Sequence, residues 1–279
     1  MKKITCLILL LTFVSCSPEK EVFKIMTYNI RYDNPNDGEN QWANRKEFLV
    51  SQIKYNEVAV FGIQEGLHHQ VQHLNKEFTD FNYVGIGRDD GKEKGEYSAI
   101  FYNSKKLKVL ENNTFWLSET PNEISVGWDA SMERICTYAV FESIKTKQQF
   151  LVFNTHFDHI GSAARLESSK LINNKIEEIN TTNLPLFILG DLNLLPKSNP
   201  IKYLSKHFSD CKEITLLEPF GPTGTFNGFK FHEPVKDRID YIFTNKEKVL
   251  VHKYAVLSDS KDCKYPSDHL PVVIEIEFK

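Results

Sequence analysis

The sequence lacks several features that would mark special classes of protein. Its longest apolar run, residues 4–14, has eleven members, short of the roughly 20 that a membrane-spanning helix needs. Thirteen glycines and eleven prolines among 279 residues exclude collagen-like and low-complexity chains. A net charge of −3 excludes a protein that coats polyanions through its overall charge, although a local basic site could still bind nucleic acid.

What is present is ordinary for a soluble globular protein. Hydrophobic residues make up 41% of the chain, with 20 Phe and 11 Tyr, which is enough for a packed core and excludes a disordered chain. The length suits one large domain or two small ones. Because no linker-like stretch divides the chain, we expect one domain over residues 22–279.

Cysteine is scarce and widely spaced. Two of the five cysteines, Cys6 and Cys16, lie in the first sixteen residues, which leaves Cys136, Cys211 and Cys263. Three cysteines at wide spacing predict neither a disulfide framework nor a zinc motif. One bridge between Cys211 and Cys263 is an open alternative, but buried or free thiols are the expectation.

The first sixteen residues have the pattern of an export signal. Lys2 and Lys3 precede the apolar run, and the small residue Ser15 precedes Cys16. The ending Phe-Val-Ser-Cys resembles a bacterial lipobox, which implies that Cys16 is lipidated and becomes the mature N-terminus. Residues 17–21 would then be a short tether. We expect an exported bacterial lipoprotein, anchored to a membrane and facing the periplasm or cell surface, with cleavage at an ordinary signal peptide as the alternative.

Hydrophobic periodicity predicts a strand-rich chain with interspersed helices, hence an α/β or α+β fold. Strands are expected at residues 22–30, 57–63, 81–87, 97–102, 108–116, 134–141, 150–155, 186–189, 237–244, 248–257 and 272–278. Helices are expected at residues 41–55, 67–78 and 162–180, the last with Ser162 as its N-cap. The longest segment without a pattern is 118–131, and long loops in compact domains are often functional.

Six of the predicted elements carry acids, amides or histidines at or beside a strand end, which suggests one polar site at a common edge. The residues concerned are Asn29, Glu65, His156, Asp191 with Asn193, Asp240, and Asp268 with His269. Asn, Glu and Asp oxygens suit Mg²⁺, with Mn²⁺ as an alternative. Such a cation, together with histidines and carboxylates, suits in-line attack of water on phosphorus.

These motifs resemble those of the endonuclease/exonuclease/phosphatase superfamily. They are Tyr-Asn29-Ile-Arg, Gln-Glu65, Asn154-Thr-His156, Gly-Asp191-Leu-Asn193, Arg-Ile-Asp240-Tyr and Ser-Asp268-His269. Each motif is weak alone, but all six in order are specific, and the resemblance runs from about residue 23 to residue 278. It implies a four-layer sandwich, in which two mixed β-sheets pack face to face and are flanked by helices.

The resemblance also implies a role for each polar residue around the metal and the water. Glu65 should be the main Mg²⁺ ligand, helped by Asn29. Asp268 should lie at the metal or at a second metal. Asp191 should orient or deprotonate the attacking water, with Asn193 beside it. Taken singly, Asn29 and Asp191 have an ordinary alternative as turn residues, and Glu65 has one as a helix cap.

Two histidines complete the implied machinery. His156 and His269 should contact the phosphate oxygens or the leaving group. Asp240 should orient His269, and the alternative for Asp240 is a structural ion pair with Arg238. Glu96 resembles the acid that pairs with the first histidine in deoxyribonuclease I, so we expect it to pair with His156.

Four further residues are predicted to bind substrate. Arg88, Arg134 and Arg165 are expected phosphate clamps, and ordinary ion pairing is the alternative for the first two. Trp128 is expected to stack on a base or sugar, with packing against its own loop as the alternative.

Together these features predict a Mg²⁺-dependent hydrolase of phosphate esters, acting as a nuclease-like phosphodiesterase outside the cytoplasm. One alternative is a phosphatase or phosphodiesterase of lipid, inositol or sugar phosphates, similar to a sphingomyelinase. Another is a binding lipoprotein without catalysis. The expected partners are a phosphate-ester substrate, with nucleic acid among the options, and a membrane through the lipid on Cys16. The chain is expected to be a monomer.

Overall fold

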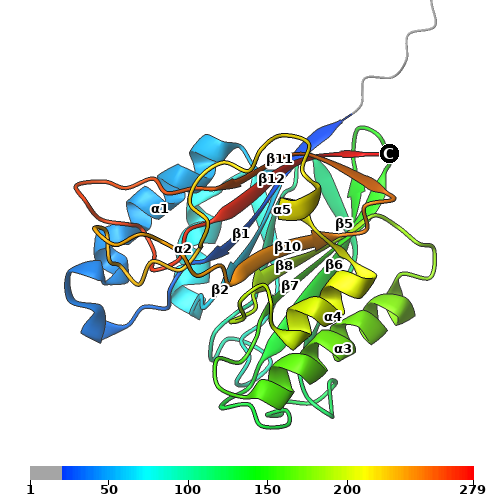
Figure 1. The fold of residues 1–279 in the computed structure, drawn as a ribbon, viewed down its shortest axis with the longest axis horizontal. Helices are drawn as coiled ribbons and strands as arrows, with labels where there is room; N and C mark the ends of the chain where they lie inside the picture. The colour runs from blue at the N-terminus through cyan, green and yellow to red at the C-terminus, as the bar shows by residue number, and fades with distance from the viewer. Residues whose placement is uncertain (1–20) are drawn as a thin grey trace, which may run out of the picture.

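The protein is a four-layer sandwich, as the resemblance implied. The computed structural model describes residues 21–279, so the predicted signal peptide and all but the last tether residue lie outside the described part. Two six-stranded mixed sheets pack face to face, and helices cover the two outer surfaces (Figure 1). The strands of the expected α/β architecture are therefore present in two layers of equal size.

The first sheet has the strand order β11-β12-β1-β2-β4-β3. Only β1 and β2 run parallel, and the other pairs are antiparallel. Its strands are β1 (Val22–Asn29), β2 (Val60–Gln64), β3 (Phe81–Val84), β4 (Ile100–Asn103), β11 (Val249–Val256) and β12 (Val272–Phe278). The strands predicted at residues 81–87 and 97–102 are clearly shorter than expected, because β3 ends at Val84 and β4 starts at Ile100.

The second sheet has the order β5-β6-β7-β8-β10-β9, with β7 and β8 as its parallel pair. Its strands are β5 (Leu107–Trp116), β6 (Ile135–Ser143), β7 (Gln149–His156), β8 (Leu186–Asp191), β9 (Ser209–Asp210) and β10 (Asp240–Thr244). Each sheet thus has one parallel pair near its centre, and the carboxyl ends of both pairs lie at the same edge of the sandwich.

Helices α1 (Trp42–Asn56) and α2 (His68–Glu77) cover the first sheet, and α3 (Ser162–Ile179) and α4 (Asn199–His207) lie side by side over the second (Figure 1). The apolar stripe of α1 is buried at Trp42, Leu49 and Ile53, which confirms the helix predicted at residues 41–55. The short elements η1 (Pro35–Asn40) and α5 (Cys211–Ile214) were not predicted, since such short elements carry little periodic signal. Helix α4 was also missed, although it buries one apolar face through Ile201 and Leu204.

The prediction that Ser162 caps α3 was wrong. The helix begins at Ser162 itself, and the cap position is Gly161, which has no capping side chain. The carboxylate of Asp129 instead accepts hydrogen bonds from the main-chain N–H groups of Ala163 and Ala164. The loop after β5 therefore supplies the helix cap, a contact between segments that local sequence does not reveal.

The polar side chain of Asn154, in β7, bridges the two sheets beneath the site. Its Nδ2 donates to the carbonyl oxygens of Ile63 and Ala99 at 2.9 Å each, and its Oδ1 accepts from Gln64 Nε2 at 2.6 Å. A Cβ atom on Gly62 would lie 2.6 Å from Asn154 Oδ1, so glycine is needed there. Asn154 thereby fixes the spacing of the two sheets beneath the site.

The cysteines confirm the expectation of free thiols. Cys136 and Cys211 are buried, Cys263 is exposed, and within the described residues the alternative bridge between Cys211 and Cys263 is not formed. Across residues 21–279, none of the helices combines the length and apolar character that crossing a membrane requires.

Candidate active site

The polar strand ends do meet at one edge, as predicted. Asn29 ends β1, Glu65 follows β2, His156 ends β7 and Asp191 ends β8. Asp240 begins β10 directly opposite Asp191 in the antiparallel register. The site therefore lies on the seam between the two sheets, and its residues come from segments far apart in the chain.

Asp191 is at the centre of the site. Its side chain is buried, with Oδ2 2.9 Å from Asn29 Nδ2, 3.4 Å from His156 Nε2 and 3.7 Å from His269 Nε2. Oδ1 accepts the main-chain N–H of Asn193. Burial and the neighbouring charge of Asp240 raise the pKa of Asp191 to about 7, even though His269 and Asn29 favour its ionised form. A carboxylate with such a pKa is suited to act as a base near neutral pH.

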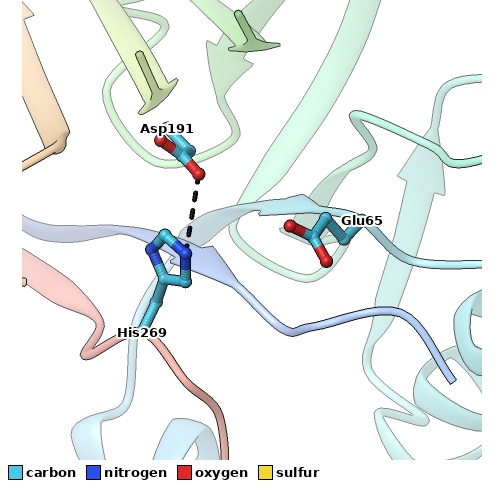
Figure 2. A group of neighbouring side chains, drawn as sticks. All are labelled: Glu65, Asp191 and His269. Atoms are coloured by element: carbon cyan, nitrogen blue, oxygen red, sulfur yellow. Dashed lines mark ion pairs between the residues drawn. The ribbon is translucent and has the colours of Figure 1, made fainter. Parts of the chain in front are cut away.

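His269 is held as a cation. Its Nδ1 lies 2.9 Å from Asp240 Oδ2, the partner predicted for it. Burial alone would lower the pKa of His269, but Asp240 and Asp191 raise it well above its usual value. The alternative ion pair between Asp240 and Arg238 is not the arrangement found, because Arg238 pairs with Asp210 at 2.7 Å. His269 Nε2 therefore carries a proton and points toward Asp191, as the dashed line in Figure 2 marks.

His156 is held neutral on the other side of Asp191. Burial, together with the charges of Arg134 and Arg88, lowers its pKa well below the usual value. Asn193 Nδ2 donates both to the carbonyl oxygen of Phe157 and to His156 Nε2, at 3.0 Å each. The Phe157 carbonyl fixes which end of the amide faces His156, so Nε2 accepts and Nδ1 carries the proton.

Glu96 lies beside His156, but its closer partner is an arginine. Its carboxylate forms a two-bond ion pair with Arg88, at 2.8 and 3.0 Å, and Oε2 is 3.8 Å from His156 Nδ1. The predicted pairing with His156 is thus present as a longer contact. Arg88 is therefore an ion-pair partner, which was the alternative to its predicted role as a phosphate clamp. Its side chain is buried rather than on the surface.

The other predicted substrate contacts are tied to the loop after β7. Arg134 is buried and pairs with Asp158 at 3.3 Å, and Arg165 donates to the carbonyl oxygen of Asp158 at 3.2 Å. Trp128 is partly buried in the loop that also holds Asp129. Both arginines therefore organise the loop next to His156, and direct contact with substrate remains a prediction for them and for Trp128.

Asn29 is oriented differently from a simple metal ligand. Its Oδ1 accepts the main-chain N–H of Arg31 at 3.0 Å, so the nitrogen Nδ2 faces both Asp191 Oδ2 and Glu65 Oε1 at 2.9 Å. A protonated amide nitrogen does not bind a cation. In this arrangement Asn29 links Glu65 to Asp191, and its role as a ligand remains a prediction.

Arg31 was missed as a site residue. Its guanidinium lies between Asp268, with Nε 3.8 Å from Oδ2, and Glu65, with Nη1 3.9 Å from Oε2, and is hydrogen-bonded to Asp37. The only signal in the sequence was its place two residues after Asn29. Three non-glycine site residues, Arg31, Glu65 and Asn193, have φ between 50° and 64°, and such strained backbone is typical of functional sites.

The donor set fits a divalent cation. Single ligand atoms of Glu65, Asp191 and His269 all lie within 4.8 Å of one another (Figure 2). Because His269 is protonated, the available donors are the two carboxylates, whose oxygens suit Mg²⁺ or Mn²⁺. Burial raises the pKa of Asp268 as well as that of Asp191. The buried carboxylates therefore carry more negative charge than the neighbouring positive side chains neutralise.

The chain belongs to the endonuclease/exonuclease/phosphatase family, whose model matches residues 26–269. The members of this family are metal-dependent hydrolases of phosphate esters. The chain is therefore an enzyme of that class, which confirms the reaction class predicted from the six motifs.

Three similar proteins illustrate the match. A family member from Bacteroides thetaiotaomicron is 35% identical, with a TM-score of 0.90 over 94% of this chain and 99% of its own. A mannosyl-6-phosphatase from the same organism is 36% identical, with a TM-score of 0.87 over 91% of this chain and 99% of its own. A protein of Acanthamoeba polyphaga mimivirus is 26% identical over 257 residues, covering 85% of this chain and 92% of its own.

Proposed function

We propose that this protein is a Mg²⁺-dependent phosphatase that hydrolyses a sugar phosphate outside the cytoplasm, with Asp191 activating the attacking water. The observation that carries the proposed mechanism is the position of Asp191, buried between a neutral and a protonated histidine with its pKa raised to about 7. The substrate class is supported by the 36% identity to a mannosyl-6-phosphatase across nearly the whole chain.

In the proposed reaction Asp191 takes a proton from water, and the water oxygen forms a bond to phosphorus while the bond from phosphorus to the sugar oxygen breaks. The sugar oxygen takes up a proton from solvent and leaves as a hydroxyl group, and Asp191 then returns its proton to solvent. Nε2–H of His269 donates to a phosphate oxygen and stabilises the negative charge that develops there. Asp240 keeps that proton on His269. The amide of Asn29 donates to Oδ2 of Asp191, which helps to orient the carboxylate for the attacking water.

Glu65 would hold the cation, beside Asp191. When bound, the divalent ion neutralises charge on the phosphate oxygens and polarises the phosphorus. Asn29 keeps Oε1 of Glu65 close to Asp191, and the main-chain N–H of Tyr32 binds Oε2 at 3.1 Å. Both oxygens of Glu65 are thereby positioned before the cation arrives.

The arginines favour a small substrate over a polymer of phosphates. The chain has six arginines, and all are engaged within the protein. Four of them form ion pairs: Arg31 with Asp37, Arg88 with Glu96, Arg134 with Asp158, and Arg238 with Asp210. The other two donate to main-chain carbonyl oxygens: Arg45 to that of Ile30, and Arg165 to that of Asp158. A nucleic-acid groove needs cations that face the backbone phosphates.

A nuclease-like phosphodiesterase is the second candidate, and one exposed aromatic side chain near His269 is compatible with it. Phe226 is 40% exposed, and its ring centroid lies 5.1 Å from that of His269. An exposed aromatic beside the reacting centre offers a surface on which a base can stack. The same surface suits the apolar face of a sugar, so Phe226 serves either substrate.

The export signal gives the proposed location. We propose that the lipid on Cys16 anchors the enzyme to a membrane as a monomer, on the periplasmic or outer side. The support is the pattern of residues 1–16, in which two lysines, an apolar run and a lipobox-like ending occur in the expected order.

The test compares four substrates with the purified full-length protein, each with Mg²⁺ and with chelator. They are mannose 6-phosphate, p-nitrophenyl phosphate, bis(p-nitrophenyl) phosphate and single-stranded DNA. Mg²⁺-dependent release of phosphate from the two monoesters is the expected result. Cleavage of the diester and DNA alone would favour the nuclease-like candidate, and an Asp191→Asn variant with full activity would overturn the proposed mechanism.

A further inference from the structure

Arg31 is held rigidly at the edge of the site. Its Nε and Nη2 donate to the two oxygens of Asp37, at 2.9 and 3.0 Å, a geometry that fixes the plane of the guanidinium. Its main-chain N–H donates to Asn29, and its carbonyl oxygen accepts from Arg45 and Gln70. The residue is therefore fixed through both its main chain and its side chain, in a backbone conformation with φ of 55°.

The fixed guanidinium faces two of the residues expected to bind metal. It lies 3.8 Å from Asp268 Oδ2 and 3.9 Å from Glu65 Oε2. The other oxygen of Asp268 lies 3.4 Å from the Ser267 hydroxyl, which donates at 2.7 Å to the carbonyl oxygen of Asn29. Asp268 therefore has the positive charge of Arg31 beside one oxygen and the Ser267 hydroxyl beside the other.

The two oxygens of Glu65 divide the site into two sides. Oε1 faces Asn29, which in turn contacts Asp191, whereas Oε2 faces Arg31. On the Asn29 side, the carboxylates of Glu65 and Asp191 have protonated His269 as their nearby positive charge. The second side already contains a positive charge between two acids, and a divalent ion placed there would be repelled by it at short range.

We propose that Arg31 occupies the position of a second cation, so that the enzyme binds one divalent ion on the Asp191 side of Glu65. Asp268 then serves as a counter-ion for Arg31 rather than as a metal ligand. This inference deepens the proposed function, because it rests on the metal dependence proposed there. It concerns the number of ions and the roles of Arg31 and Asp268, and leaves the substrate open.

The experiment counts bound Mn²⁺ by electron paramagnetic resonance, in the absence of substrate, with the full-length protein. The wild type is expected to bind one ion per chain, and Arg31→Met, which removes the charge but keeps the length, is expected to bind two. Arg31→Lys should restore a stoichiometry of one. Arg165→Met removes another arginine close to the site and is the matched control, expected to bind one ion.

A second variant keeps the inference testable if Arg31→Met fails to fold, which circular dichroism would show. Asp268→Asn should still bind one ion, with its affinity changed less than threefold. A loss of affinity of tenfold or more would make Asp268 a ligand and overturn the inference. Two ions in the wild type, or one in a folded Arg31→Met, would also overturn it and leave the proposed function intact. A wild type that binds no ion would overturn both.

Discussion

Nδ1 of His269 lies 2.9 Å from Oδ2 of Asp240, and both side chains are buried. The contact joins the loop before β12, in the first sheet, to the start of β10, in the second. It keeps His269 protonated in a place where burial alone would remove the proton. The charge at the reacting centre therefore depends on a residue that is itself shielded from substrate.

We expect His269→Ala to lower kcat by about two to four decades, since charge stabilisation of the phosphate is worth that much. Asp240→Asn should cost less, because the imidazole remains. It should lower the pKa of His269 and move the alkaline limb of the pH–rate profile to lower pH. Steady-state rates between pH 5 and 10 test this, and a larger loss for Asp240→Asn than for His269→Ala would mean that Asp240 acts directly.

Mg²⁺ binding should weaken as the pH falls below about 7. Burial raises the pKa of Asp191 to about 7, so the acid is protonated below that pH, and a nearby cation must displace the proton. Calorimetry at pH 6 and pH 8 should show weaker binding and more proton release at pH 6. Asp191→Asn should remove this dependence, and equal wild-type affinities at the two pH values would contradict the assignment.

Asp158 should contribute a pH-dependent part of the stability. Burial would raise its pKa, but hydrogen bonds from Gly161, Ser131 and Ile160, and the charge of Arg134, hold it below its usual value. Its contribution is therefore present above about pH 4 and is lost as the pH falls toward the folded-state pKa.

Asp158→Asn leaves the charge of Arg134 buried without its partner, which costs about 3–5 kcal/mol at pH 7. Urea unfolding of both proteins from pH 7 to pH 3 measures the difference in free energy of unfolding. This difference in the free energy of unfolding should narrow below about pH 4, because the wild-type carboxylate then takes up a proton more readily in the unfolded state than in the folded state. A difference that stays constant over the whole range would show that the carboxylate charge is not the cause.

Arg45→Met should destabilise the protein by about 3 kcal/mol or more, because it leaves several buried carbonyl oxygens without their donor. Arg45 is 4% exposed and donates to the carbonyl oxygens of Ile30, Arg31, Asn40 and Pro266. Urea unfolding measures the loss. Arg165→Met, which removes one such bond, is the control, and an equal loss in both variants would contradict this role of Arg45.

Cys16→Ser should release the protein from the membrane fraction of cells, because the variant has no thiol to carry the lipid. Metabolic labelling with a fatty-acid analogue should mark the wild type and leave the variant unlabelled. Cys263→Ser, which removes an exposed free cysteine, is the matched control and should remain labelled. Labelling of the Cys16→Ser variant would contradict the lipobox assignment.

The sequence predicted the strand ends well because each motif combines a buried strand with a polar residue that ends it. Asp191, Glu65 and His156 stand directly at or after such ends. Arg31 was not predicted as part of the site, because its neighbours Asp37, Glu65 and Asp268 come together only in the folded chain. The Asp129 cap of α3 was missed for the same reason, since Asp129 lies 33 positions before Ser162 in the sequence.

The orientation of amide groups is a second kind of information that the sequence does not contain. Asn29 was expected to present an oxygen to the cation, but the main-chain N–H of Arg31 binds that oxygen. Which end of an amide faces a site depends on its hydrogen-bond partners, and those partners are set by the tertiary structure.

The amide of Asn154, which bridges the two sheets beneath the site, ties activity to the alignment of the two layers. Asn29, Glu65 and His269 lie on or next to strands of the first sheet, and His156, Asp191 and Asp240 lie on strands of the second. Neither sheet alone therefore carries all the groups that the proposed reaction needs. A small slip of one layer over the other would separate base from cation while every strand stayed intact. Turnover would then fail before any spectroscopic sign of unfolding, and activity would report the alignment of the layers.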